Sequence, residues 1–263
     1  MEKSKISVIL ATYNNEAYIK GSIESVLNQT YQNFELIIID DASNDLTSEI
    51  ISKIKNKKIK YIRNKKNLGL VKCLNKGLEI AKGEFIARID GDDVAVRNRF
   101  KKQLDFLKAR KDIKAVGTFA QEIDEQGNKG KIIKFPKNSR EIRKVIPQYI
   151  PFLHPTLMFR RSVFEEIGNY DERFKYAQDH DLMLRITGKF KTANIPQVLL
   201  LYRKHAKSIS FERMSEQLKL AFFARLKALK NGDIKFWQSI YLIKPAVSLL
   251  IPVAFKKLFL KLK

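Results

Sequence analysis

The sequence predicts an α/β fold in which a mostly parallel central sheet is flanked by helices. The first hundred residues alternate between short β-branched runs and segments with apolar residues at helical spacing, a pattern typical of βαβ units. The chain has 263 residues, 44% of them hydrophobic, which suffices for one large domain with a buried core. Near residue 211 the composition shifts to helix-forming, basic and aromatic residues. We therefore expect a main domain over residues 1–210 and a helical, basic-amphipathic extension over 211–263.

Strands and helices alternate strictly in the first half of the chain. The predicted strands cover residues 6–11, 34–40, 59–63 and 84–89. A helix over 19–27 follows the possible caps Asn14 and Asn15, and another covers residues 68–82. Right-handed crossovers bring the carboxyl ends of parallel strands to one edge, so the loops after the first, second and fourth strands should converge there. We expect a ligand at that edge.

The second half is less regular. Its predicted elements are a helix from Phe100 to Leu107, a strand at 113–119, a hairpin turn at 124–130, short helices at 141–148 and 179–185, and an extended segment at 192–203. No repeat or low-complexity linker divides the chain.

Charge and composition limit the partners and the compartment. A net charge of +23 attracts nucleic acid, phosphorylated small molecules or an anionic membrane surface. The single cysteine, Cys73, excludes an internal disulfide and fits a reducing compartment. The apolar run that follows Lys5 is too short for a signal-peptide core, so we expect a cytoplasmic protein. Glycine-rich phosphate loops and a serine nucleophile elbow are absent from the sequence, so phosphate must be held by metal and basic side chains.

Three carboxylates, Asp90, Asp92 and Asp93, follow the fourth predicted strand in "RIDGDDVAV". Mg²⁺ and Mn²⁺ prefer such hard oxygen ligands, and residues i and i+2 of an extended chain point the same way. Asp90 and Asp92 could thus face one cation while Asp93 faces elsewhere. A solvated turn, or a cap for the helix beginning near Val96, is the alternative. The position at the ligand edge favours the metal site.

Polar residues also end the first two strands. In "IIIDDASND", Asp40 or Asp41 could accept hydrogen bonds from a base or ribose. The alternative is that one of them caps the next helix, although Asp45 or Thr47 could do so instead. The stretch "ATYNNE" offers small and polar residues where a nucleotide could lie, although turn formation would also select them.

The segment "AQDHDLMLR" holds Asp179 and Asp181 at the start of a helix. The helix dipole favours negative charge there, and a carboxylate in a cleft can also act as a general base, so both interpretations remain open. We expect His180 to point outward, and the isolated His154 and His205 to be ordinary packed or exposed residues unless another signal assigns them.

Taken in order, five motifs resemble family 2 of the inverting, nucleotide-sugar-dependent glycosyltransferases, which have the GT-A fold. They extend over roughly residues 5–210: "SVILATYNNEAYIKGSIESVLNQTYQNFELIIIDDASND", "NLGLVKCLNKGLEIAKGEFIARIDGDD", "HPTLMFRR", "QDHDLMLR" and "YRKHAKSIS". The resemblance implies a GT-A catalytic domain with a nucleotide-sugar half at about 1–119 and an acceptor half at about 120–210.

The resemblance also implies roles for single residues. The nucleoside pocket would be lined by Thr12, Tyr13, Glu16 and Asp41, with Asp41 facing a base that is usually uracil, and with Asn67 and Arg88 near the nucleotide. Asp90 and Asp92 would hold ribose and a divalent cofactor, Mn²⁺ or Mg²⁺. His205 matches a position that completes the coordination shell of this metal in some relatives.

The remaining implied roles concern the reaction. Asp179 would be the general base that deprotonates the acceptor hydroxyl, and Gln178 replaces the acid that commonly precedes it in the family. The "HPTLMFRR" motif, with His154, would approach the acceptor. Direct displacement at the anomeric carbon would invert its configuration without a covalent intermediate.

The C-terminal segment 236–263 joins aromatic and aliphatic residues to lysines and contains no acid. Its apolar stretch from Pro245 to Phe255 is too short to cross a bilayer, which needs about 20 residues. An interfacial helix drawn to anionic lipid and a helix pair packed on the catalytic domain both remain open. The first would make the protein peripheral on the inner face of the cell membrane, with a lipid-linked, lipopolysaccharide or capsule glycan as acceptor.

Nucleic-acid binding without transferase activity is the competing function. The basic run at 53–66 prompts it, but Tyr61 is the one aromatic residue there instead of a stacking series. A nucleotidyltransferase of related fold would need a glycine-rich basic loop after the first strand, which "ATYNNEAY" lacks. We therefore expect no nucleic-acid partner.

Overall fold

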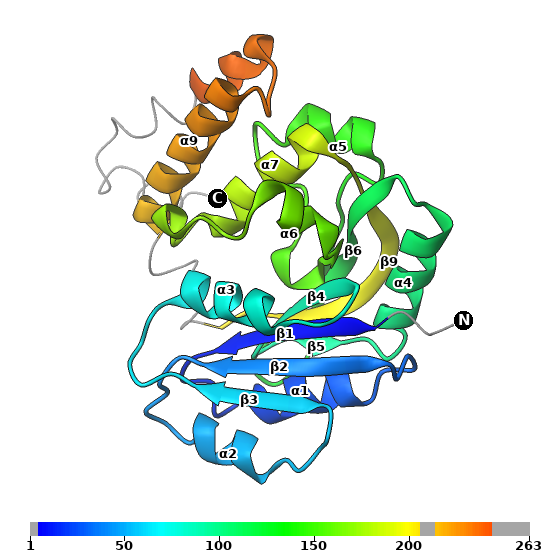
Figure 1. Cartoon of the computed structure of the whole chain (residues 1–263), viewed down its shortest axis with the longest axis vertical. Coiled ribbons are helices and arrows are strands. Elements are labelled where there is room, and N and C mark those ends of the chain that lie inside the picture. Colours follow the sequence, from blue (N-terminus) through cyan, green and yellow to red (C-terminus); the bar gives the residue numbers. More distant parts are fainter. Residues whose placement is uncertain (1–4, 206–213, 244–263) are drawn as a thin grey trace.

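The computed structural model describes residues 5–205 and 214–243 (Figure 1). Its first half comprises β1 (Ile6–Thr12), α1 (Ile19–Leu27), β2 (Phe34–Asp40), α2 (Thr47–Lys53), β3 (Ile59–Arg63), α3 (Leu70–Ile80) and β4 (Phe85–Asp90). These strands are parallel in the order β3-β2-β1-β4. Thr12 pairs with Asp40 and Ala11 with Asp90, so the predicted convergence of the strand ends is confirmed.

The second half continues the same sheet. It comprises β5 (Val94–Ala95), α4 (Arg99–Ala109), β6 (Ile113–Ile123), β7 (Lys129–Ile133), α5 (Ser139–Val145), η1 (His154–Thr156), β8 (Met158–Arg160), α6 (Ser162–Ile167), η2 (Glu172–Phe174), α7 (Gln178–Lys189) and β9 (Lys191–Arg203). Strand β8 lies antiparallel between β4 and β6, and β6 is parallel to β9. Strands β7 and β5 add antiparallel partners to β6 and β9. The sheet therefore has a parallel half, formed by β3, β2, β1 and β4, and a mixed half.

Apolar side chains fill both faces of the sheet. Every residue of β1 is buried, as expected for a parallel strand covered on both sides. Helices α1, α2 and α4 supply the core on one face, and α3, α5, α6 and α7 supply it on the other. Figure 1 shows α1 and α2 on one side of the parallel strands and α3 on the opposite side. The α/β class with flanking helices is confirmed.

The C-terminal extension packs on the main domain over its described part. Helix α9 (Met214–Asn231) is followed by η3 (Phe236–Leu242). Buried Arg225 of α9 donates hydrogen bonds to the carbonyl groups of Pro147 and Gln148 beyond α5. Lys227 forms ion pairs with Asp171 and with buried Asp181 of α7. Helix α9 thus packs on the main domain, whereas most of the segment 236–263 lies outside the described residues, so both interpretations of that segment stay predictions.

None of the helices within residues 5–205 and 214–243 has the length and apolarity that a bilayer crossing requires.

The predicted caps of the first helix are wrong. The N-cap position of α1 is Tyr18, without a side-chain hydrogen bond. Asn15 contributes its backbone carbonyl, which accepts from the N–H groups of Tyr18 and Ile19. The Asn14 side chain instead accepts from the N–H of Asn44, so the polar pair links two loops at the ligand edge.

Candidate functional site

The three aspartates after β4 form one cluster. A carboxylate oxygen from each of Asp90, Asp92 and Asp93 lies within 4.8 Å of the others. Both Asp90 oxygens contact the guanidinium of Arg88, at 2.6 and 2.9 Å. Asp92 Oδ2 lies 2.9 Å from Nε2 of His205, which enters from the segment after β9. The sequence-predicted residues Arg88, Asp90, Asp92 and His205 are therefore brought together.

Asp93 is a full member of the cluster, contrary to the expectation that it faces elsewhere. It is completely buried, and its Oδ1 accepts the backbone N–H of Arg203 at 3.0 Å. Its Oδ2 is buried without a partner among the described residues. It does not cap the following helix, because Asn98 occupies the N-cap of α4. The chain turns at Gly91, and this turn directs the Asp93 side chain inward.

The cluster suits a divalent cation. Burial, followed by the nearby Asp90 carboxylate, raises the pKa of Asp92, and burial with both neighbouring carboxylates raises the pKa of Asp93 well above its usual range. Carboxylate oxygens are the hard ligands that suit Mn²⁺ and Mg²⁺. A bound cation would relieve the repulsion and occupy the space near the unpartnered Asp93 oxygen.

Hydrogen bonds from two arginines hold the backbone around the cluster in place. The side chain of Arg99 is fully buried and donates from Nη2 to the Arg88 carbonyl at 2.7 Å. Arg203 donates from Nε to the Asp92 carbonyl at 3.0 Å. Gly91 lies so close to the end of β1 that an added Cβ would be 2.9 Å from Thr12 Oγ1. A side chain at position 91 would therefore push the two strand ends apart.

Asp41 joins the end of β2 to the loop before α3. Its carboxylate accepts from Asn64 Nδ2 and the Leu68 N–H at 2.8 Å, and from the Gly69 N–H at 2.7 Å. Asn67, which is exposed, is carried on this loop. The Asp41 carboxylate therefore holds in place the loop that borders the ligand edge.

The remaining residues of the predicted nucleoside pocket lie after β1. Thr12 is buried, and its Oγ1 has no partner in the described part of the chain. Tyr13 is 46% exposed, and exposed Glu16 accepts the N–H of Leu46. The geometry leaves the Tyr13 ring accessible to a ligand, and the role of each residue stays a prediction.

Asp179 lies in the first turn of α7 and is partly buried. Its Oδ1 accepts the N–H of His180 at 2.8 Å. Burial raises the pKa of this carboxyl, while the positive charge of Arg88 opposes the shift and the negative charge of Asp90 adds to it. Asp179 is therefore close enough to Arg88 and Asp90 for the charges of both side chains to act on its carboxyl.

Two further predicted histidines are buried. Nε2 of His154 lies 2.8 Å from the hydroxyl of Tyr170, and burial together with the charge of Arg88 lowers the pKa of this imidazole well below its usual range. His154 is therefore a neutral partner of Tyr170 behind the site, and an acceptor role stays a prediction. His180, expected to point outward, is instead buried, because α7 is packed between the sheet and the α5–α9 layer.

Sequence reasoning missed three residues that shape the site, Asn64, Tyr170 and Arg203, and assigned Asp93 the wrong orientation. Arg203 stands within "YRKHAKSIS", so the position of that motif offered a signal. No sequence signal points to Tyr170, because its hydrogen bond with His154 joins segments that only the folded chain brings together.

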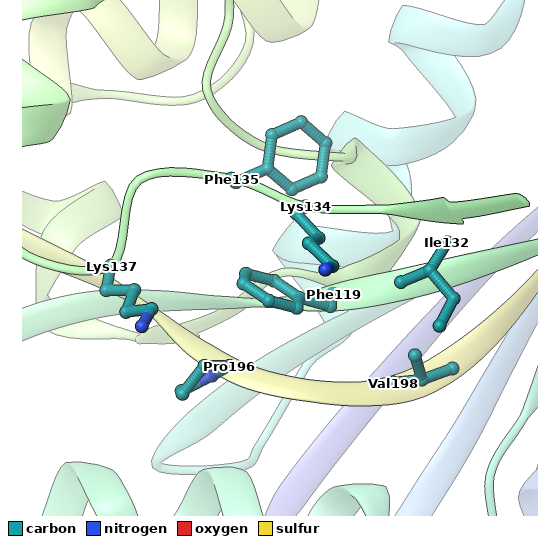
Figure 2. Close-up of a pocket in the computed structure, with 7 residues that line it drawn as sticks. All are labelled: Phe119, Ile132, Lys134, Phe135, Lys137, Pro196 and Val198. Carbon is teal, nitrogen blue, oxygen red and sulfur yellow. The ribbon is translucent and has the colours of Figure 1, made fainter.

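A groove of about 490 Å³ lies between β6, β9 and the segment that follows β7. Figure 2 shows Lys134 beside the ring of Phe119, with Ile132 and Val198 toward one end and Lys137 and Pro196 toward the other. Val198 precedes Arg203 by five residues of β9. At a strand rise of ~3.3 Å per residue, the groove lies on the order of 16 Å from the aspartate cluster.

Comparison with known proteins gives one family match, to the family described as "Glycosyl transferase family 2", over residues 7–168. An uncharacterized glycosyltransferase of Methanocaldococcus jannaschii is 34% identical over 249 residues, covering 90% of this chain and 86% of the relative. An Escherichia coli protein named UDP-Glc:alpha-D-GlcNAc-diphosphoundecaprenol beta-1,3-glucosyltransferase is 33% identical over 218 residues, covering 81% of this chain and 83% of the relative.

Solved structures share the fold. TarS of S. aureus, residues 1–349 in complex with UDP-GlcNAc, superposes with a TM-score of 0.71 at 22% identity, covering 92% of this chain and 71% of that one. A mannosyltransferase of Pyrobaculum calidifontis in complex with GDP-Man and Mn²⁺ gives a TM-score of 0.68 at 17% identity, covering 94% and 72%. At these identities the likeness concerns the GT-A fold alone.

Proposed function

Since the chain belongs to glycosyl transferase family 2 and is a glycosyltransferase, we propose that it moves a sugar from a UDP-sugar to a hydroxyl of a lipid-linked or surface-glycan acceptor, with inversion at the anomeric carbon. One observation carries the proposal: the end of β4 holds a cluster of three aspartates, and a fourth carboxylate, Asp179, lies within range of the charge of Asp90 and is made more basic by burial. A leaving-group site and a base thus flank the same space.

The donor is held at the ends of β1 and β2. Asp41 accepts from Asn64, Leu68 and Gly69, so its carboxylate is fixed in place before a base binds. Preorganised groups bind a ligand without first losing conformational freedom. Exposed Tyr13 follows Thr12, whose carbonyl accepts the Asp41 N–H at 2.9 Å, and its aromatic ring suits a planar uracil.

Asp92, His205 and Asp90 are the residues that would hold a divalent metal, Mn²⁺ or Mg²⁺. Such a metal, when bound, neutralises charge on the diphosphate leaving group. The choice of Asp92 over Asp90 as the main ligand follows from the hydrogen bonds, because both oxygens of Asp90 already contact Arg88.

Asp179 acts as the general base. It removes the proton from the acceptor hydroxyl as that oxygen attacks the anomeric carbon, and the bond from this carbon to the diphosphate oxygen breaks. Asp179 ends protonated, UDP leaves, and one displacement inverts the configuration. The positive charge of Arg88 opposes the rise in the pKa of Asp179 that burial causes, and so favours the ionised base.

The groove beside Phe119 suits the part of the acceptor that lies away from the reacting hydroxyl. Its walls are apolar and include Lys134 and Lys137. The lysines suit a phosphate group, and the apolar walls suit a neighbouring hydrophobic chain or the face of a sugar ring. The E. coli relative is named for an acceptor that carries a diphosphate on a lipid. Replacing both lysines by alanine should raise the acceptor KM while leaving the donor KM unchanged.

A panel of UDP-, GDP- and dTDP-sugars, each with Mn²⁺ and a GlcNAc-diphospholipid acceptor, tests the function. We expect one UDP-sugar to be consumed, with release of UDP that EDTA abolishes. Failure of all donors, together with RNA binding that weakens steeply with salt, would instead support the nucleic-acid alternative.

A further inference from the structure

Four large apolar side chains project from one short segment near the end of the described chain. Phe236 and Trp237 are 84% and 64% exposed, and Ile240 and Ile243 are 62% and 60% exposed. We call these four residues the apolar patch. Single exposed apolar residues are ordinary in soluble proteins, but contiguous ones mark a binding surface.

The patch is held in its position by the opposite side of η3. Gln238 and Leu242 of η3 are buried. Gln238 donates from Nε2 to the Arg143 carbonyl of α5 at 3.1 Å, and its Oε1 accepts the N–H of Lys235. These contacts leave the patch pointing away from the domain, so substitutions in it should not disturb folding.

Basic residues outnumber the acids Glu141 and Asp233 on α5 and in the segment that leads into the patch. Exposed Arg140 and Lys144 lie on α5, against which η3 packs, and Lys235 directly precedes the patch. The sequence that continues from it, residues 244–263, contains five lysines and no acidic residue. A partner for this surface must therefore combine an apolar layer with negative charge.

We propose that the apolar patch inserts into the interfacial layer of an anionic lipid bilayer. Tryptophan and phenylalanine favour that layer, and nearby lysines and arginines contact lipid phosphates. A second copy of the chain would fit the patch poorly, because each copy carries a net charge of +23. The inference rests on the proposed function only where it places the enzyme on the membrane that carries its acceptor.

Trp237 makes the test direct, because it is the one tryptophan of the chain. Full-length protein is mixed with phosphatidylcholine vesicles with or without phosphatidylglycerol. With the anionic vesicles we expect a blue shift of Trp237 emission, quenching by brominated lipid, and co-sedimentation. Neutral vesicles, or high salt, should weaken binding severalfold because the phosphate contacts are electrostatic.

The Phe236→Ser/Ile240→Ser double variant retains the tryptophan and should lose at least ~10-fold in vesicle affinity, as expected when two large apolar side chains no longer enter the bilayer. Leu46→Ser is the matched control, since Leu46 is 57% exposed next to the distant helix α2 and should leave binding unchanged. Equal circular dichroism spectra would establish that both variants fold.

Three results would overturn the proposal. The first is no emission shift and no co-sedimentation with anionic vesicles. The second is dimerisation without lipid that the double variant abolishes, because the patch would then bind a second copy. The third is a tryptophan already shielded from a soluble quencher in buffer and insensitive to vesicles. The vesicle-binding experiment needs no sugar donor, so its result can be interpreted even if the transferase assay fails.

Discussion

Replacing Asp179 with asparagine tests the assignment of the base. The asparagine side chain has the same shape and keeps an oxygen that can accept the His180 N–H, so the start of α7 should be unchanged. Removing a general base typically costs about 10²–10⁴ in rate. Because burial makes Asp179 more basic, we expect kcat to fall by ~10³–10⁴, or about 4–5 kcal/mol of activation free energy.

The assay follows UDP release with saturating acceptor, while calorimetry measures UDP binding in Mn²⁺. Binding should match the wild type, since the lost charge acts on the acceptor hydroxyl.

The same carboxyl sets the pH dependence. Burial raises the pKa of Asp179, and the base works only when ionised, so the wild-type kcat/KM should decline as the pH falls through this raised pKa. The residual rate of Asp179→Asn should lack that acid limb. Turnover near the wild-type value, or an unchanged acid limb in the variant, would refute Asp179 as the base.

Three further substitutions probe the frame around the site. Asp92→Asn should weaken Mn²⁺-dependent UDP binding by at least ~10–100-fold in calorimetry, with metal-free binding unchanged; equal affinity would exclude Asp92 as a ligand. Asn64→Ala removes a donor to the Asp41 carboxylate and should lower both UDP affinity and the free energy of unfolding, the latter by about 1–3 kcal/mol in urea. Asp181→Asn leaves two cations of α7 and α9 without their buried partner and should cost about 3 kcal/mol of stability, again by urea unfolding, without changing the UDP affinity.

Local patterns predicted the parallel half of the fold well. Strands β1, β2 and β4 are apolar runs between helical segments, and their buried faces leave little freedom in direction or register. Strand β8 was not predicted, because a strand of three residues has too little periodicity. Its position between β4 and β6 follows from long-range pairing that the sequence does not display.

The same distinction holds in the site. Asp90, Asp92 and Asp179 stand in motifs at element ends, so spacing and resemblance found them. Asp93 seemed superfluous because alternation along an extended chain points it away, yet the chain turns at Gly91 and buries it beside its neighbours. His180 seemed exposed because helical spacing alone could not reveal that α9 covers α7.

The anomeric configuration of the product tests the central claim most directly. With the UDP-sugar that the panel identifies, proton NMR of the new glycosidic linkage gives the configuration through its coupling constant. We predict inversion relative to the donor, because Asp179 activates the acceptor for a single displacement at the aspartate cluster. Retention of configuration would contradict both this mechanism and the assignment of the two carboxylate sites.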